Sequence, residues 1–295
     1  MKSPMKSPIS PTVLATLAAL AAFAANAQPV PSTKTAPPTK PAASAAPKAP
    51  VKAAPTKFNA AAALNRAASQ PMLAERITKS FNMIGQKVLE PRARRQLDES
   101  LKEFAAGLKE LQAISPTPDI RDNYDLLEQL FSEFKTITAK PINLASAKEL
   151  AEQNEELVFI AQKGSMLLQA HTKSAQSDLI ATAGDVRTLT QRIAKLYLFR
   201  SWGIRTSVIA DDLKKAEGEY RADMDRLLRV AQNSAQVKSE LALAETQWLF
   251  LKQGIDRLNA NKSSPTELEF VAKSCDNILE VMERVTKLYE AMKTS

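Results

Sequence analysis

Residues 71–83 read PMLAERITKSFNM, and residues 187–199 read RTLTQRIAKLYLF. The two stretches align without a gap at an offset of 116 residues (187 − 71), and the alignment continues through residues 71–111 and 187–227. Chance similarity seldom keeps register over about 40 residues, so the alignment indicates duplication of one folding unit. The aligned pairs include Leu73 with Leu189, Ile77 with Ile193, Phe104 with Tyr220 and Leu108 with Met224.

Apolar residues around and beyond the repeat follow a helical period. From Leu64 to Met292 glycine is scarce, prolines are confined to a few joints, and no run alternates apolar and polar residues as a strand would. Steps of four and three residues place each apolar stripe on one helix face, which is typical of bundle packing. Two such stripes are Val237, Leu241, Ala244, Trp248, Leu251 and Ile255, and Leu268, Val271, Cys275, Ile278, Met282, Val285 and Tyr289.

Helix start and stop signals divide each copy into four helices. Ser264 precedes a proline and a glutamate in a pattern typical of a helix N-terminus. The predicted helices are 70–89, 92–114, 119–138 and 144–172 in the first copy, and 176–204, 207–233, 236–260 and 265–293 in the second. The expected fold class is therefore all-α, with two tandem four-helix bundles over residues 61–172 and 173–295.

The junction between the copies allows two interpretations. Only isolated glycines interrupt the chain between Ser146 and Trp202, so the fourth helix of copy one could run straight into the first helix of copy two. A shared helix of about 55 residues would be about 80 Å long and would hold the two bundles end to end in an elongated molecule. The alternative is a break near residues 171–177, where the apolar stripe slips register.

The N-terminal residues have the composition of an export signal. Lys2 and Lys6 precede a short apolar run that ends in Ala25-Asn26-Ala27, which predicts a signal peptide over residues 1–27 and a periplasmic location; an uncleaved N-terminal anchor is the alternative. Residues 28–60 are rich in proline, alanine and lysine, a composition that predicts a disordered linker.

The charge distribution argues against a nucleic-acid partner. The chain has a formal net charge of +8 from 40 basic and 32 acidic residues. Seven of the basic residues lie before Phe58 and all the acidic residues follow it, so the remainder carries a net charge of +1. A nearly neutral fold lacks the basic surface that nucleic-acid binding requires.

Residues that could perform catalysis are scarce. His171 is the only histidine, and the sequence has no glycine-rich phosphate loop and no recognisable metal-binding motif, so no enzyme, metal or cofactor is expected. Cys275 is the only cysteine and falls in an apolar stripe, where a thiol usually behaves as a small buried hydrophobe.

The second copy contains an arginine beside its core stripe. Gly184, Arg187 and Gln191 are spaced three and four residues apart on one helix, while Arg192 lies on another side. A buried guanidinium needs a counter-anion, and its planar donors suit carboxylates and oxyanions. Arg187 therefore either pairs with an acidic residue of a neighbouring helix or binds a small anion.

The stretch Gly184 to Lys195 resembles the motif of the sensory domain at the N-terminus of type IV pilus (PilJ-type) chemoreceptors. It matches that motif at Gly184, Arg187, Gln191, Arg192, Ala194 and Lys195, with Thr190 in place of a serine. The stretch is also similar to the corresponding box of the nitrate/nitrite (NarX-type) sensor domain.

This resemblance implies a periplasmic, ligand-sensing four-helix module in two copies over about residues 70–290. In the nitrate sensors, the arginine aligned with Arg187 contacts the anion near a dimer axis, so a homodimer is also implied. Asp185 replaces a basic residue of the pilus motif and could neutralise Arg187. In the first copy Pro71 occupies the Arg187 position and Glu75 the Gln191 position, so that copy is expected to be structural only.

Two functions remain open from the sequence. The first is a non-catalytic exported sensory protein that binds nitrate, nitrite or a carboxylate through Arg187, Gln191, Arg192 and Gly184, and acts through a membrane receptor or envelope protein. The second is a structural helical adaptor of the cell envelope without a small-molecule ligand. The chain ends at Ser295 soon after the last helix, which favours a free or loosely tethered protein over a complete receptor.

Overall fold

The computed structural model describes residues 59–205, 207–260 and 264–292, all within one compact unit, Pro55–Ser295. The described residues form eight α-helices and contain no strand, which confirms the all-α fold class. The helices are α1 (Ala60–Gly85), α2 (Glu90–Ile114), α3 (Pro118–Thr138), α4 (Leu144–Thr172), α5 (Ala175–Ser201), α6 (Ile209–Leu228), α7 (Ala235–Ala260) and α8 (Pro265–Glu290).

The first helix is longer than the sequence predicted. It begins at Ala60 rather than near residue 70, because the Asn59 side chain caps the backbone N–H of Ala62 and a run of alanines favours helix. Pro71 therefore lies inside α1 rather than at its start. A proline within a helix removes one backbone hydrogen bond, and α1 continues through Pro71 despite this loss.

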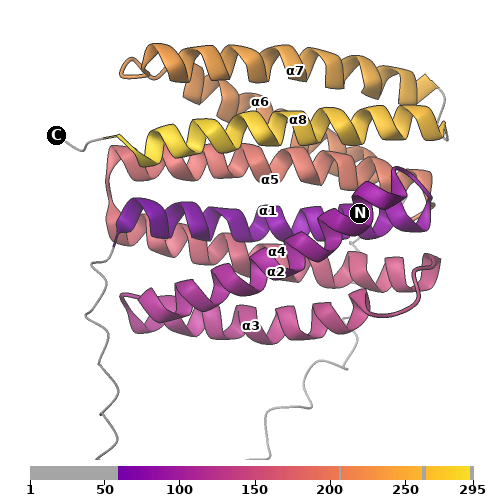
Figure 1. The fold of residues 1–295 in the computed structure, drawn as a ribbon, viewed down its shortest axis with the longest axis horizontal. Helices are drawn as coiled ribbons and strands as arrows, with labels where there is room; N and C mark the ends of the chain where they lie inside the picture. Colours follow the sequence, from indigo (N-terminus) through magenta and orange to yellow (C-terminus); the bar gives the residue numbers. More distant parts are fainter. Residues whose placement is uncertain (1–58, 206, 261–263, 293–295) are drawn as a thin grey trace, which may run out of the picture. The chain divides into compact units, whose positions relative to one another are not determined.

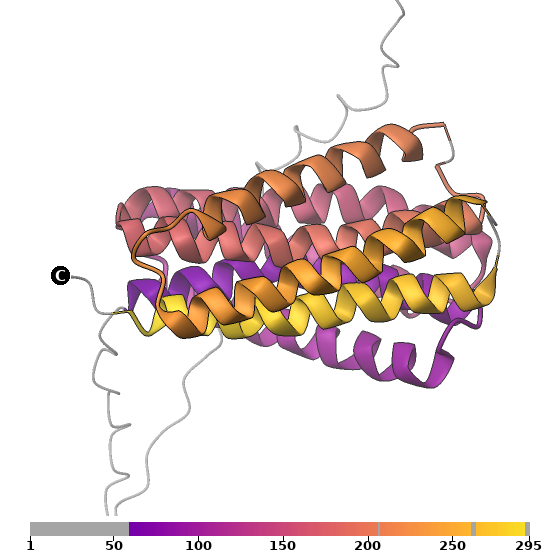
Figure 2. The same ribbon diagram turned by 90° about the horizontal axis from the view of Figure 1, so that it is seen from above.

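Each half of the molecule is a four-helix group with the same pattern of neighbours. In the first half α1 packs against α2 and α4, and α3 packs mainly against α4; in the second half α5 packs against α6 and α8, and α7 mainly against α8. Figure 1 shows α7 and α3 at opposite edges of the molecule with α5 and α1 between them, and Figure 2 shows α6 and α2 on opposite flanks. The apolar stripes listed above face the interior of these groups.

The expectation of one long helix shared by the two halves was wrong. Helix α4 ends at Thr172, Lys173 adopts a left-handed conformation with φ 41°, and the Ser174 side chain caps α5. The chain therefore reverses direction within two residues, as in the alternative interpretation of residues 171–177. The two halves consequently lie side by side, with α1 packed along α5, rather than end to end (Figure 1).

Local geometry repeats between the halves at the sequence offset of 116 residues, or within one residue of it. The α1–α2 loop has left-handed residues at Lys87 and Leu89, and the α5–α6 loop has them at Gly203 and Arg205. The pair Phe104–Phe131 stacks with ring centroids 4.1 Å apart, and Tyr220–Trp248 stacks at the corresponding place with centroids 4.2 Å apart. The two halves therefore share loop and core geometry as well as helix order.

Helices α1 and α5 run parallel and form the seam between the halves. Hydrogen bonds between the two helices follow the same order along both, from Asn65 with Arg187 to Gln86 with the Leu198 carbonyl. At Gly184 a Cβ atom would lie 2.5 Å from the Cβ of Ala68, the residue that the offset pairs with it. Corresponding residues thus meet face to face, as they would across an approximate twofold axis along the seam.

Residues 1–58 lie outside the described residues, and so do the expected signal peptide and all but the end of the expected linker. Of the eight described helices, none combines the length and the apolar character needed to cross a membrane.

Candidate functional site

Arg187 lies at the seam between α5 and α1. Its side chain is 4 % exposed, and its guanidinium donates to the Oδ1 of Asn65 at 3.0 Å and to the Oγ of Ser69 at 3.3 Å, both on α1. The Asn65 amide in turn donates to a carboxylate oxygen of Glu290 on α8 at 2.8 Å. These neutral partners orient the guanidinium, and the Nε of Arg187 has no hydrogen-bond partner among the described residues.

The charge of Arg187 is not neutralised by direct contact. Burial lowers the pKa of Arg187 to about 10, against the opposing effects of Glu283, Asp185 and Glu290. None of the described carboxylates lies within 4.0 Å of the guanidinium nitrogens, and Asp185, which from its position in the motif could have neutralised Arg187, is exposed and forms no ion pair with it. An unpaired buried cation of this kind is suited to receive an anionic group.

Arg187 opens into a groove, here called the Arg187 groove, which lies between α1, α2 and α8 and has a volume of about 720 Å³. Asn65 and Ser69 line it beside the guanidinium, and Met72 and Leu73 supply apolar wall. Glu283 and Glu290 line it from α8. The groove therefore combines one buried cation, an apolar wall and acidic groups.

The four residues of the sequence motif are not all gathered at this groove. Gly184 lies beside Arg187, because a Cβ at Gly184 would be 3.6 Å from an Nη atom of the arginine. Gln191 is fully buried, its side-chain atoms have no hydrogen-bond partner among the described residues, and it does not line the groove. Arg192 lines a different pocket, formed with α4 and α6.

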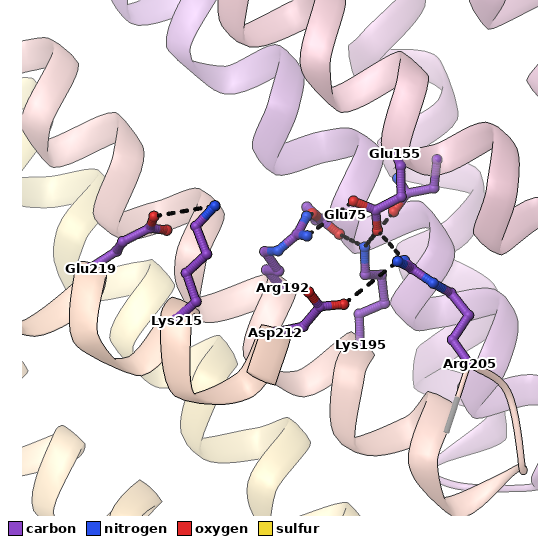
Figure 3. A network of polar contacts seen from close by, with 9 residues as sticks. Glu75, Glu155, Arg192, Lys195, Arg205, Asp212, Lys215 and Glu219 are labelled. Atoms are coloured by element: carbon purple, nitrogen blue, oxygen red, sulfur yellow. Dashed lines mark hydrogen bonds and ion pairs between the residues drawn. The ribbon is translucent and has the colours of Figure 1, made fainter. Parts of the chain in front are cut away.

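Arg192 belongs to a buried network of ion pairs, shown in Figure 3. It contacts Glu75 and Glu155, each at 2.9 Å, and Lys195 contacts the same two carboxylates at 2.7 and 3.1 Å. Arg205 also contacts Glu155, at 2.8 Å. The network joins α1, α4 and α5, and its cations already have carboxylate partners, so Arg192 serves to hold the helices together.

A matching ion pair occupies the other side of the seam. Lys79, which the offset pairs with Lys195, is fully buried and contacts Asp276 of α8 at 2.5 Å. Asp276 also accepts from Arg92 at 3.0 Å and from Gln96 at 2.8 Å. Although burial alone would raise the pKa of Asp276, its contacts with Lys79 and Gln96 lower it, so the carboxylate remains charged.

A second groove corresponds to the Arg187 groove across the seam. It has a volume of about 440 Å³ and is lined by α4, α5 and α6, with Pro71 at the position equivalent to Arg187. Gln162 and Gln169 line it from α4. We call it the Pro71 groove. Because it has no counterpart of the buried guanidinium, the two grooves differ in chemistry although they share a backbone framework.

The described residues offer no evident catalytic or metal-binding arrangement. No group of three or more histidine, cysteine, aspartate or glutamate side chains in the described part of the chain is arranged to hold a metal ion. Cys275 is buried, as its stripe predicted, and burial raises the pKa of its thiol far above the ordinary value. A thiol in this state is a poor nucleophile.

Sequence reasoning missed the α1 and α8 residues that surround Arg187. Asn65 and Ser69 precede the predicted start of the first helix, and Glu283 and Glu290 lie on a helix whose neighbour was not known. The run of alanines after Asn59 was the available signal for a longer α1.

A known family model matches part of the chain. Residues 57–157 match the family model PilJ, described as the N-terminal region of the type IV pili methyl-accepting chemotaxis transducer. The matched residues cover α1, α2, α3 and part of α4. They lie in the half whose motif positions hold Pro71 and Glu75. No curated protein and no solved structure matches the chain.

Proposed function

We propose that the chain is a non-catalytic sensory protein in which the Arg187 groove binds a ligand through a carboxylate or oxyanion group. The PilJ match supports a sensory module, since the matched family is the N-terminal region of a chemotaxis transducer. The observation that carries ligand binding is the buried guanidinium of Arg187, which has no carboxylate in contact and faces a groove. The PilJ match also favours a periplasmic location and a partner in or near the membrane.

We also propose that the second half is a further copy of the PilJ-like unit. The gap-free offset of 116 residues, the repeated left-handed loop residues and the repeated aromatic stacks support this. The relation to the nitrate sensors rests on the sequence motif alone. On this proposal the α1–α5 seam takes the place that a homodimer interface has in those sensors, so the Arg187 groove needs no second chain.

Thermal unfolding in the presence of anions tests the binding proposal. A ligand that binds only the folded state raises stability by about 2.7 kcal/mol at a hundredfold excess over its Kd. Chloride at matched ionic strength is the control for nitrate, nitrite, acetate and larger carboxylates, amino acids included. This control is needed because salt alone changes the stability of a protein with many charged surface residues. We expect a saturable rise in Tm for at least one of these compounds, and none for chloride.

Two variants make the test specific to Arg187. Arg187→Ala should abolish the ligand-dependent rise, while Arg121→Ala, which removes one positive charge from the exposed face of α3, should retain it. If no compound outperforms chloride, or if Arg187→Ala responds like the unaltered protein, the groove is not the binding site.

A second candidate function is a helical adaptor that binds another protein. The observation in its favour is the exposure of large apolar side chains on the outer surface, since Phe159 and Met166 of α4 are 65 % and 67 % exposed, and Leu249 of α7 is 62 % exposed. Phe159 and Met166 lie two helical turns apart on one face of α4. Retention of an envelope protein by the unaltered chain, and its loss with Phe159→Ser and Met166→Ser together, would favour this function.

A further inference from the structure

The Arg187 groove contains an unpaired carboxylate as well as the unpaired guanidinium of Arg187. Glu283 of α8 is half-buried, lines the groove, and forms no hydrogen bond or ion pair with any described residue. Among the charged groups that raise the pKa of Arg187, Glu283 has the largest effect, although its carboxylate oxygens lie more than 4.0 Å from the guanidinium nitrogens. The groove thus presents opposite charges that are near each other but not in contact.

The other charges of the groove are already engaged or lie on its rim. Glu110 is paired with Arg66 at 2.8 Å, and Glu290 accepts the hydrogen bond from Asn65. With three basic and four acidic side chains lining it, the groove has a formal net charge of −1. A simple inorganic anion at Arg187 would therefore be attracted by one buried cation and repelled by nearby carboxylates.

The Pro71 groove provides an internal comparison. Where the Arg187 groove has its arginine, the Pro71 groove has a proline, and where it has Glu283 and Glu290, the Pro71 groove has Gln162 and Gln169 (both at an offset of 121). Asn154–Glu155 and Cys275–Asp276 share the same offset, and both pairs face the equivalent lysines. At these three equivalent positions, the Arg187 groove thus has a guanidinium and two carboxylates, and the Pro71 groove has a proline and two neutral amides; the charged residues that line the Pro71 groove, Asp185, Glu219, Asp223 and Arg226, occupy other positions.

We propose, on the basis of the function proposed above, that the ligand of the Arg187 groove is a zwitterion of the amino-acid class. Its carboxylate lies against Arg187 and its ammonium group against Glu283. The aliphatic wall formed by Met72 and Leu73 then faces the ligand's side chain, which favours an apolar amino acid. A zwitterion satisfies both unpaired charges without adding net charge to the groove, whereas nitrate or acetate satisfies only one.

Isothermal titration calorimetry with the purified protein tests this proposal. The twenty protein amino acids are screened, and the one that binds most tightly is compared with two analogues, one lacking the amino group and one lacking the carboxylate. We expect each analogue to bind at least about tenfold more weakly, because each leaves a charged group of the groove without its partner. Nitrate and acetate are titrated alongside.

The variant Glu283→Gln separates the zwitterion proposal from the binding proposal. This substitution should lower the affinity for the amino acid by about tenfold. The affinity for the carboxylate-only analogue should stay the same or rise, because one negative charge that repels the analogue has been removed. Glu240→Gln, which alters a half-buried acid of α7 paired with Arg284 and outside the groove, is the matched control and should bind like the unaltered protein. Melting curves check that both variants fold.

Each outcome has a distinct meaning. If the carboxylate-only analogue, nitrate or acetate binds as tightly as any amino acid, or if Glu283→Gln leaves amino-acid affinity unchanged, the zwitterion proposal is overturned while anion binding at Arg187 stands. If no amino acid, carboxylate, nitrate or nitrite binds, both proposals fail.

Discussion

Replacing Gly184 by alanine tests the close approach of α1 and α5. The new Cβ would lie 2.5 Å from the Cβ of Ala68, about 1 Å inside the ordinary carbon–carbon contact distance of about 3.5–4.0 Å. Both atoms are attached directly to helix backbones, so the helices must separate. Overpacking costs about 1–3 kcal/mol, and an overlap of this size belongs in the upper half of that range. Alanine regains about 1 kcal/mol of helix propensity, which leaves a net loss of about 1–2 kcal/mol.

Denaturant unfolding followed by circular dichroism measures this loss, with Gly218→Ala as the matched control. Gly218 lies inside α6, and a Cβ there would meet nothing within 4 Å, so only the propensity gain of about 1 kcal/mol remains. The two substitutions should therefore shift stability in opposite directions. If Gly184→Ala stabilises the protein as Gly218→Ala does, the described spacing of the seam is incorrect.

Three further predictions concern buried groups. Lys79→Met should destabilise the protein by about 3 kcal/mol in chemical denaturation, because Asp276 is left buried with only Arg92 and Gln96, and adding Asp276→Leu should recover much of the loss. Burial alone would raise the pKa of Glu155, but Lys195 and Arg192 outweigh it and lower the pKa to about 2. The stability that Glu155 contributes should thus be complete above about pH 5 and lost as pH falls toward 2, which unfolding midpoints across that range would measure. Cys275 should react with a thiol reagent only after unfolding, and rapid labelling of the folded protein would contradict its burial.

Helix identity could be predicted from the sequence because its signals are local. The four-and-three spacing from Leu268 to Tyr289 and the cap at Ser264 are properties of one segment, and the structure places α8 at Pro265–Glu290. The break at Lys173 had only a weak signal, since a lysine seldom adopts the left-handed conformation and neither glycine nor proline marks the turn. The choice between a shared helix and a turn therefore depended on tertiary packing.

The surroundings of Arg187 were less predictable, because they involve residues distant in sequence. The period correctly placed Arg187 beside the core stripe, yet its partner Asn65 lies 122 residues away, before the predicted start of the first helix. The sequence did contain a signal for Arg192. Glu75 stands where the second copy has a glutamine, and in the structure this carboxylate contacts Arg192 across the seam.

Because one polypeptide contains both halves, a mutation changes only one side of the seam, and dilution does not separate the halves. Two identical subunits related by a twofold axis must repeat every substitution on both sides of their interface. In this chain a codon change alters only one side of the α1–α5 seam, so an arginine and a proline can face equivalent grooves in the same molecule. The halves also remain together at any protein concentration, because their association is intramolecular. A trace amount of the protein should therefore keep the seam, and the single Arg187 groove beside it, intact.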